Sequence, residues 1–230
     1  MPDWLEFSIF DMTPYDTQGW LGLIESFQQD YTYIPMVSLL FTALLAFMIL
    51  RPPFPEAPRL VLAFLAFAWF WCGWVFQMQY HASLNWAAPQ FGWVFIVQTA
   101  LLALVAIFGK SLTWRRPGIR YQWPSLLILM LAALYPLIGL MEGRTTQQLE
   151  WLGLMPTPTT LATLGVMMLL GGRVLWLLMP IPVLWALVSA AFTWRLDLFE
   201  PYITAVALLL CLTTYLLKTR YSNKAPKPYT

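Results

Sequence analysis

Charged residues are scarce in this chain. Asp, Glu, Lys and Arg make up 10% of the 230 residues, whereas 60% are hydrophobic and 17% are aromatic. A soluble domain carries about a quarter charged residues, because its surface faces water. The apolar residues here also come in long runs without charge, which is typical of membrane spans. The composition therefore predicts one membrane domain with short tails.

Histidine, cysteine and glycine-rich motifs are also scarce, and each shortage excludes a class of chemistry. A single histidine, His81, excludes a bis-histidine haem within one subunit, and the last apolar run has no internal lysine for a retinal Schiff base. No serine elbow, phosphate loop or basic helix face is present. Cys72 and Cys211 fall in different apolar runs, which favours two buried thiols over a disulfide or a metal pair. We expect no cofactor, no metal and no nucleic acid partner.

Residues 1–32 form an acidic lead that contains no Lys or Arg. Thr13-Pro14 followed by Asp16 is typical of a helix start, with Pro14 as the first helical residue. The apolar residues that follow recur at helical spacing: Trp20, Leu23, Ile24 and Phe27. This pattern predicts an amphipathic helix that lies on the membrane surface or on the outer end of the domain. Simple packing onto the domain is the other interpretation.

Seven apolar stretches follow the lead, and none has Asp, Glu, Lys or Arg in its interior. They cover residues 33–50, 60–80, 91–109, 125–141, 157–172, 174–194 and 201–217. The chain is therefore predicted to be all-α, a polytopic bundle of seven transmembrane helices over residues 33–217. Pro136 is expected to kink the fourth span, and Pro180 with Pro182 the sixth. Broken helices can build binding sites, although proline kinks also serve plain packing.

The charges between these stretches segregate by side. With seven spans, 11 of the 13 Lys and Arg residues share one side, and ten of the 11 acids lie on the other. The basic set is Arg51, Arg59, Lys110, Arg115, Arg116, Arg120, Arg173, Lys218, Arg220, Lys224 and Lys227. Because Lys- and Arg-rich loops stay in the cytoplasm, the N-terminus with its helix is predicted outside, and residues 218–230 form a basic cytoplasmic tail.

Polar residues gather at the predicted outer end of the bundle. The candidate polar mouth consists of His81, Asn85, Glu142, Arg144, Thr159, Thr160, Asp197 and Glu200. Such a mouth could bind a cation, a metal or a small solute. Met78, Met141 and Met155 lie at similar predicted depth, and with His81 they would suit a soft metal. The alternative is that these are solvated loop residues, with His81 held by hydrogen bonds at the interface.

Three stretches resemble a bacterial membrane-protein family known only as domain of unknown function 6064. They are Tyr80-His81 with Leu84-Asn85, Ala87-Ala88, Phe91-Gly92 and Gln98; Tyr135-Pro136-Leu137-Ile138-Gly139 with Gly143; and Pro158-Thr159-Thr160 and Thr163-Leu164-Gly165 with Ile181-Pro182, Leu184-Trp185 and Ala190-Ala191. Trp86 and Arg144 depart from the family pattern, the latter near a position where a second histidine often stands. The resemblance implies a bacterial inner-membrane protein and carries no activity.

Three functions are compatible with this inventory. Because the predicted spans lack charge, coupling to protons or redox chemistry is disfavoured. The preferred interpretation is a non-catalytic accessory or scaffold subunit, with the lipid bilayer and other membrane subunits or a second copy as partners. The alternative is a small transporter or channel for a neutral or weakly charged solute. A third is a lipid enzyme with His81 and Glu142 as acid and base.

Overall fold

In the computed structural model, the described residues are 14–50, 55–109, 112–114, 119–171 and 175–222. Helices dominate them, so the predicted all-α class is confirmed. The α-helices are α1 (Thr17–Asp30), α2 (Ile34–Leu50), α3 (Ala57–Trp71), α4 (Ala88–Phe108), α5 (Ile119–Ala133), α6 (Tyr135–Met141), α7 (Pro156–Leu169), α8 (Leu175–Leu178), α9 (Pro180–Arg195) and α10 (Glu200–Ser222). A π-helix, η2 (Cys72–Tyr80), and two 3-10 turns, η3 (His81–Ser83) and η4 (Thr146–Gln148), complete the helical set.

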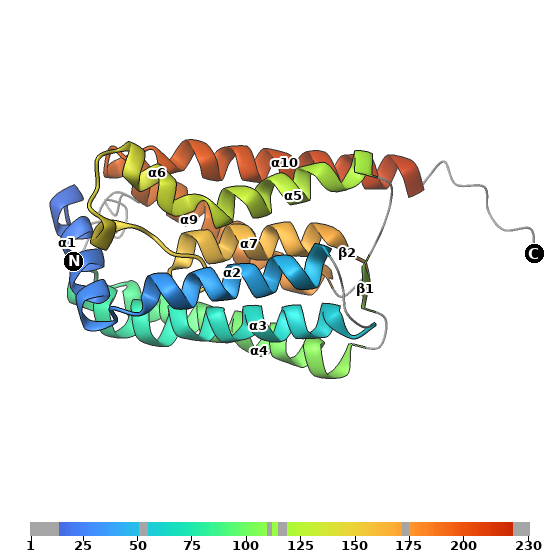
Figure 1. The fold of residues 1–230 in the computed structure, drawn as a ribbon, viewed down its shortest axis with the longest axis horizontal. Coiled ribbons are helices and arrows are strands. Elements are labelled where there is room, and N and C mark those ends of the chain that lie inside the picture. Colours follow the sequence, from blue (N-terminus) through green and yellow to red (C-terminus); the bar gives the residue numbers. More distant parts are fainter. Residues whose placement is uncertain (1–13, 51–54, 110–111, 115–118, 172–174, 223–230) are drawn as a thin grey trace, which may run out of the picture.

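One short two-stranded ladder joins distant parts of the chain. Strand β1 (Thr113–Trp114) pairs antiparallel with β2 (Leu170–Gly171), so that Thr113 lies opposite Gly171. Figure 1 shows this ladder at the end of the molecule opposite α1. It ties the segment after α4 to the end of α7.

Helix α7 is the centre of the bundle. Thirteen of its 14 residues are buried, although its first turn carries two prolines and three threonines. The prolines are tolerated because first-turn N–H groups have no partner inside the helix. Two threonine hydroxyls turn back on the helix, Thr160 to the Pro156 carbonyl and Thr163 to the Thr159 carbonyl, both at 2.8 Å. The threonines can therefore be buried without unpaired hydroxyl groups.

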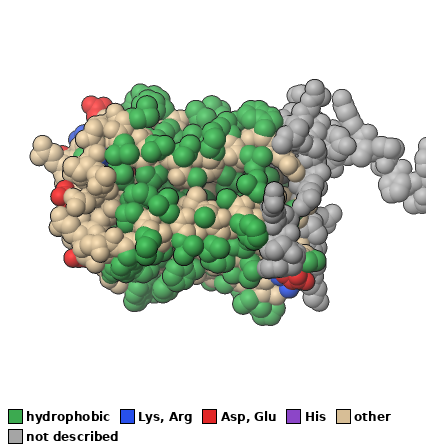
Figure 2. All heavy atoms as spheres, in the orientation of Figure 1, with side chains coloured by type: hydrophobic (Ala, Val, Ile, Leu, Met, Phe, Trp, Pro, Cys, Tyr) green, Lys and Arg blue, Asp and Glu red, His purple; other side chains and the backbone are tan. Residues whose placement is uncertain are grey.

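The sides of the bundle expose apolar side chains. Figure 2 shows hydrophobic side chains along the length of the visible face, with acidic groups near both ends and most of them at the α1 end. Large exposed residues come from several helices: Leu39, Leu40, Phe67, Val97, Leu187 and Leu209. Extended exposed apolar surface of this kind marks contact with a membrane or with partner proteins.

Fewer spans than seven pass a test of length and composition. Three described helices are long and apolar enough to cross a membrane: Ala57–Ser83, Ala88–Phe108 and Trp176–Arg195. The number rises to five if two bent pairs each count as one span. Helix α7 falls short because its 14 residues extend only about 21 Å, less than the roughly 30 Å hydrocarbon core. The described helices are therefore compatible with a membrane protein and include three to five candidate spans.

Helix α1 lies across one end of the bundle, at 87° to α2. It buries Trp20, Leu23, Ile24 and Phe27, as predicted. The predicted start was wrong: the helix begins at Thr17, and the N-cap is Asp16, whose Oδ1 accepts from the Gly19 N–H at 2.8 Å. A carboxylate satisfies the free first-turn N–H groups better than the Thr13-Pro14 pair could.

Two predicted kink positions coincide with breaks in helices. Pro136 stands at the start of α6, whose axis bends by 55° from that of α5. Pro180 opens α9 after the single turn of α8, and Pro182 is buried within the first turn. A change of helix type occurs without proline: α3 continues directly into the nine-residue π-helix η2, a form of backbone that is frequent at functional sites.

Several sequence-based expectations fall on residues that are not described. Within the basic set, Arg51, Lys110, Arg115, Arg116, Arg173, Lys224 and Lys227 lie outside the described residues, as do residues 1–13 of the lead and 223–230 of the tail. Cys72 and Cys211 are described; both are buried and they form no disulfide.

Candidate functional site

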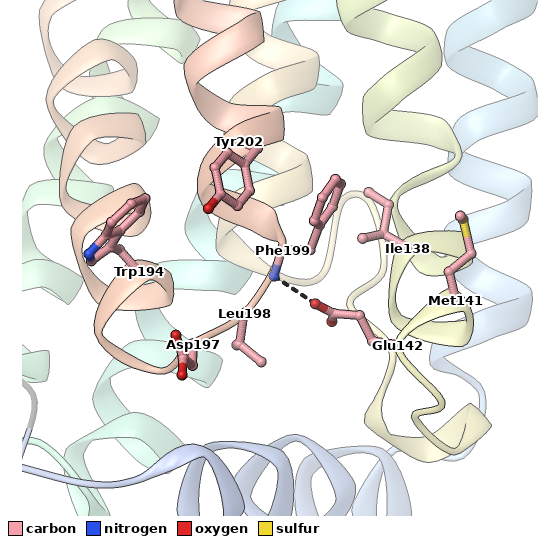
Figure 3. A pocket seen from close by; sticks show the side chains of 8 residues that line it. All are labelled: Ile138, Met141, Glu142, Trp194, Asp197, Leu198, Phe199 and Tyr202. Atoms are coloured by element: carbon pink, nitrogen blue, oxygen red, sulfur yellow. Dashed lines mark hydrogen bonds between the residues drawn. The ribbon is translucent and has the colours of Figure 1, made fainter.

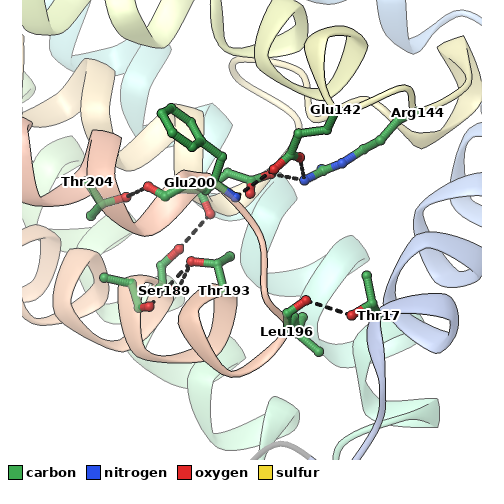
Figure 4. Close-up of polar contacts among 11 residues, drawn as sticks. Thr17, Glu142, Arg144, Ser189, Thr193, Leu196, Glu200 and Thr204 are labelled. Atoms are coloured by element: carbon green, nitrogen blue, oxygen red, sulfur yellow. Dashed lines mark hydrogen bonds and ion pairs between the residues drawn. The ribbon is translucent and has the colours of Figure 1, made fainter.

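An arginine and two glutamates form the charged part of the site. Arg144, which follows α6, donates from Nη2 to the carboxylates of Glu142 and Glu200 (Figure 4). Glu200 opens α10 and is 1% exposed, and Arg144 is 7% exposed. Glu142 also accepts from the Phe199 N–H at 2.6 Å. This ion cluster therefore joins the end of α6 to the turn between α9 and α10.

A third glutamate, Glu150, is buried close to this cluster, and no described residue makes a hydrogen bond of normal geometry with its carboxylate. Its side chain is 2% exposed. Burial raises the pKa of Glu150 to about 8, and the charge of Glu200 adds to the rise while Arg144 opposes it. A buried carboxyl without hydrogen bonds favours its neutral form. Burial of Glu150 therefore favours its protonated, neutral form.

The loop that carries Glu150 is held in place by α1. Gln28 of α1 donates to the Leu149 carbonyl at 2.6 Å, and Gln148 donates to Glu25 at 3.0 Å. The turn η4 before the loop has a capping box between Thr145 and Gln148. These bonds fix the backbone on either side of Glu150, so the carboxyl is directed into the bundle although its segment is not helical.

The single histidine lies at the end of the π-helix and also contacts the segment before α1. His81 Nδ1 lies 2.6 Å from Gln77 Oε1, and His81 Nε2 lies 2.9 Å from the Tyr15 hydroxyl. An amide oxygen can only accept, so Nδ1 carries a proton and donates it to Gln77. The ring is 1% exposed. Both ring nitrogens of His81 are thus hydrogen-bonded inside the protein.

A small enclosed cavity lies between α1, η2, α7 and α9. It is lined by Tyr15, Trp20, Gln77, His81, Pro156, Thr157, Trp185, Ser189, Phe192, Thr193 and Leu196. Its volume of about 20 Å³ suffices for about one water molecule. Thr157 and Ser189 hydroxyls meet across it at 2.8 Å. We call this cavity, together with Arg144, Glu150 and Glu200, the α1 chamber.

Buried polar atoms without partners concentrate around the α1 chamber. Among the described residues they include Trp20 Nε1, Gln77 Nε2, Tyr135 Oη, Arg144 Nε, both Glu150 oxygens, Trp185 Nε1 and Glu200 Oε2. Trp20 and Thr157 approach Glu150 closely enough to lower its pKa, although neither makes a hydrogen bond of normal geometry with it. Native proteins leave few buried polar groups unpaired, so this concentration indicates a site that takes a further hydrogen-bonding group.

Helix α1 closes the chamber through polar contacts along its length. Thr17 donates to the Leu196 carbonyl at 2.6 Å (Figure 4), and Tyr80 donates to Asp30 at 2.6 Å. Between these points Trp20 packs edge-on against His81, with ring centroids 5.4 Å apart. The chamber is therefore covered by a helix that is fastened at both ends.

The eight residues of the predicted mouth divide among four positions. Arg144 and Glu200, with Glu142 at the rim, form the ion cluster, and His81 lines the cavity. Asn85, Thr159 and Thr160 are buried and make hydrogen bonds to nearby backbone groups. Asn85 accepts from the Ala87 N–H, and Thr159 from the Gly153 N–H, each at 2.9 Å. Asp197 is exposed in the turn between α9 and α10.

The methionines and the lipid-enzyme pair do not converge on one described site. Met141 is 88% exposed, Met155 is fully buried, and Met78 packs at Gly92 of α4. No group of three His, Cys, Asp or Glu residues in the described segments could hold a metal. His81 is held by Tyr15 and Gln77, whereas Glu142 is held by Arg144 and Phe199, so the proposed acid and base have separate partners.

Sequence reasoning missed Glu150, Tyr15 and Trp20 as members of the site. Glu150 could have been found, because it is an acid between apolar residues in Leu149–Leu152, a few positions before the threonine-rich start of α7. Tyr15 and Trp20 reach the site only because α1 folds back over the bundle end, and this contact joins segments far apart in sequence.

Comparison with known proteins gives one match. A family model described as a family of unknown function (DUF6064) matches residues 18–225. No curated protein and no solved structure match the chain.

Proposed function

The chain belongs to the family of unknown function (DUF6064), and because that family brings no activity with it, we propose from the site alone that the protein is a small membrane transporter. Its solute is small and neutral or weakly charged, and it binds in the α1 chamber when α1 moves away, because the closed cavity of about 20 Å³ holds only about one water molecule. The observation that carries this proposal is the burial of Glu150 with both carboxylate oxygens unpaired, beneath a helix that closes the end of the bundle.

The buried charges favour transport over the subunit interpretation. That interpretation depended on an interior free of charge, and Arg144, Glu150 and Glu200 are all buried. Arg144 is paired with Glu142 and Glu200, and burial favours the neutral form of Glu150, so the chamber has a small net charge. Such a site suits a neutral or weakly positive solute, because a strong anion would be repelled by Glu142 and Glu200.

We propose seven spans with the N-terminus outside and the C-terminus in the cytoplasm of a bacterial inner membrane. Seven helical segments of the described chain support this number, when α1 across the bundle end is left out and α3 to η3, α5 with α6, and α8 with α9 each count as one. The short α7 counts as a span because the chain runs from Leu149, which is bonded to α1, through α7 to β2 at the opposite end of the bundle, with other helices around it. The orientation is supported by the segregation of Lys and Arg in the sequence.

Solute flux through purified protein tests the proposal. Proteoliposomes are shrunk by an osmotic jump of urea or glycerol, and their re-swelling is followed by light scattering. We expect faster re-swelling than in protein-free liposomes for at least one solute, and a loss of that gain in Glu150→Leu, which removes the carboxyl. Glu56→Leu is the matched control, because Glu56 is exposed at the start of α3, at the end of the bundle away from the α1 chamber; it should keep the gain.

The same preparation separates the transporter from a subunit of a complex. Purification from native membranes in mild detergent should yield the protein without stoichiometric partners. Co-purification of partners at fixed ratio, together with re-swelling equal to that of empty liposomes, would instead support the accessory-subunit interpretation.

A further inference from the structure

A second pocket opens near the α1 chamber, between α6 and the turn that joins α9 to α10. Its volume is about 450 Å³, and it is lined by Ile138, Met141, Glu142, Trp194, Asp197, Leu198, Phe199 and Tyr202 (Figure 3). This volume lies in the range of small-molecule sites. The pocket is outside the α1 chamber, with Glu142 in its wall and Arg144 behind that carboxylate.

Three aromatic rings stand together on one side of this pocket. Tyr202 lies 5.9 Å from Trp194 and 5.3 Å from Phe199, measured between ring centroids. All three side chains are more than half exposed: Trp194 61%, Phe199 53% and Tyr202 53%. Grouped and open aromatic faces attract cations through their negative quadrupole, and quaternary ammonium ligands use such cages.

Two carboxylates accompany the rings. Glu142 is fixed by the Phe199 N–H at 2.6 Å and by Arg144, so its position is set before any ligand arrives. Asp197 is exposed and adopts a left-handed backbone with φ of 58°, a conformation that non-glycine residues rarely take. Residues held in such backbone cluster at functional sites. Arg195, also exposed, adds one positive charge to the same turn.

We propose that this pocket, the ammonium pocket, binds an organic ammonium group between Trp194, Tyr202 and Asp197. The chemistry is shared by two sources, the ammonium of a lipid headgroup at the membrane surface and a free alkylammonium solute. The inference is independent of the transport proposed above, because it depends on rings and a carboxylate that do not belong to the α1 chamber.

Calorimetric titration of the full chain tests the ammonium pocket. The protein is placed in nanodiscs of phosphatidylglycerol, which has no ammonium group, and titrated with tetramethylammonium chloride, with potassium chloride as the salt control. We expect binding of tetramethylammonium alone. Trp194→Leu should weaken it about 3- to 10-fold, whereas Trp93→Leu on α4, equally exposed at 60%, should leave it unchanged.

Further variants and lipid compositions test the role of the carboxylate, guard against misfolding of one variant, and distinguish the two ligand sources. Asp197→Asn keeps a residue that tolerates left-handed backbone and should also weaken binding, and Tyr202→Leu serves if Trp194→Leu does not fold. If a lipid headgroup is the ligand, nanodiscs with phosphatidylethanolamine will weaken tetramethylammonium binding; if a free solute is, binding will not change. Absence of tetramethylammonium binding to the wild-type protein, or unchanged affinity in both ring variants, would overturn the proposal.

Discussion

Replacing Glu150 with glutamine should change how stability depends on pH. The pKa of the buried carboxyl is raised from 4.5 to about 8, so between these values the folded state holds a proton that the unfolded state has released. Stability then falls as pH rises through this range and levels off above it. Each pKa unit corresponds to about 1.4 kcal/mol. The free energy of unfolding therefore falls by at most about 5 kcal/mol across this pH range.

The measurement is thermal unfolding of the purified protein in detergent from pH 5 to pH 9. The wild type should lose stability as the pH rises, and Glu150→Gln, which cannot ionise, should lose less, so the two curves diverge toward alkaline pH. Glu56→Gln is the control, because Glu56 is exposed at the other end of the bundle. If the difference between wild type and Glu150→Gln is the same at every pH, the carboxyl is ionised throughout and the reasoning is refuted.

Three further predictions follow from the geometry. Arg144→Met leaves Glu200 buried without its cation and should destabilise the protein by about 3–5 kcal/mol. The double variant with Glu200→Gln should recover part of this loss. Chemical denaturation of the wild type, the two single variants and the double variant measures the loss and the recovery. A methyl group at Gly73 would lie 2.7 Å from Phe95 Cβ and 3.0 Å from the Gly92 carbonyl, so Gly73→Ala should cost about 1–3 kcal/mol, whereas Gly22→Ala on α1, with open space around it, should stabilise by about 0.5–1 kcal/mol. A fluorescent reporter fused after Thr230 should be active in the cytoplasm, and an alkaline phosphatase fused there should be inactive; the reverse would contradict the proposed orientation.

Composition and periodicity predicted the general architecture because both are local properties. The charge-free runs indicated helices in an apolar surrounding, and the spacing of Trp20, Leu23, Ile24 and Phe27 identified the buried face of α1. The number of spans was harder to predict from the sequence, because α7 alone is too short to cross a bilayer and is stabilised by the helices around it. A hydrophobic run alone does not separate a lipid-facing span from a central helix.

The site was only partly predictable because it is made by long-range contacts. The sequence indicated that Glu142, Arg144 and Glu200 share one end of the bundle, and the structure joins them in one ion cluster. It did not indicate that Glu150 is buried, since that depends on α1 holding the Leu149 backbone from 121 residues away. Nor did the residue pattern of Cys72–Tyr80 distinguish a π-helix from an α-helix, because the two share the same composition.

Labelling of a cysteine inside the α1 chamber tests the central claim most directly. Ser189 lines the cavity and is 4% exposed, so a membrane-impermeant maleimide can reach Ser189→Cys only when α1 moves away. In a background with Cys72→Ala and Cys211→Ala, we predict that intact cells label Ser189→Cys from the periplasm, whereas Ser125→Cys, buried outside the chamber, stays unlabelled. If Ser189→Cys never reacts in the folded protein, the chamber is a static polar core and not a solute site.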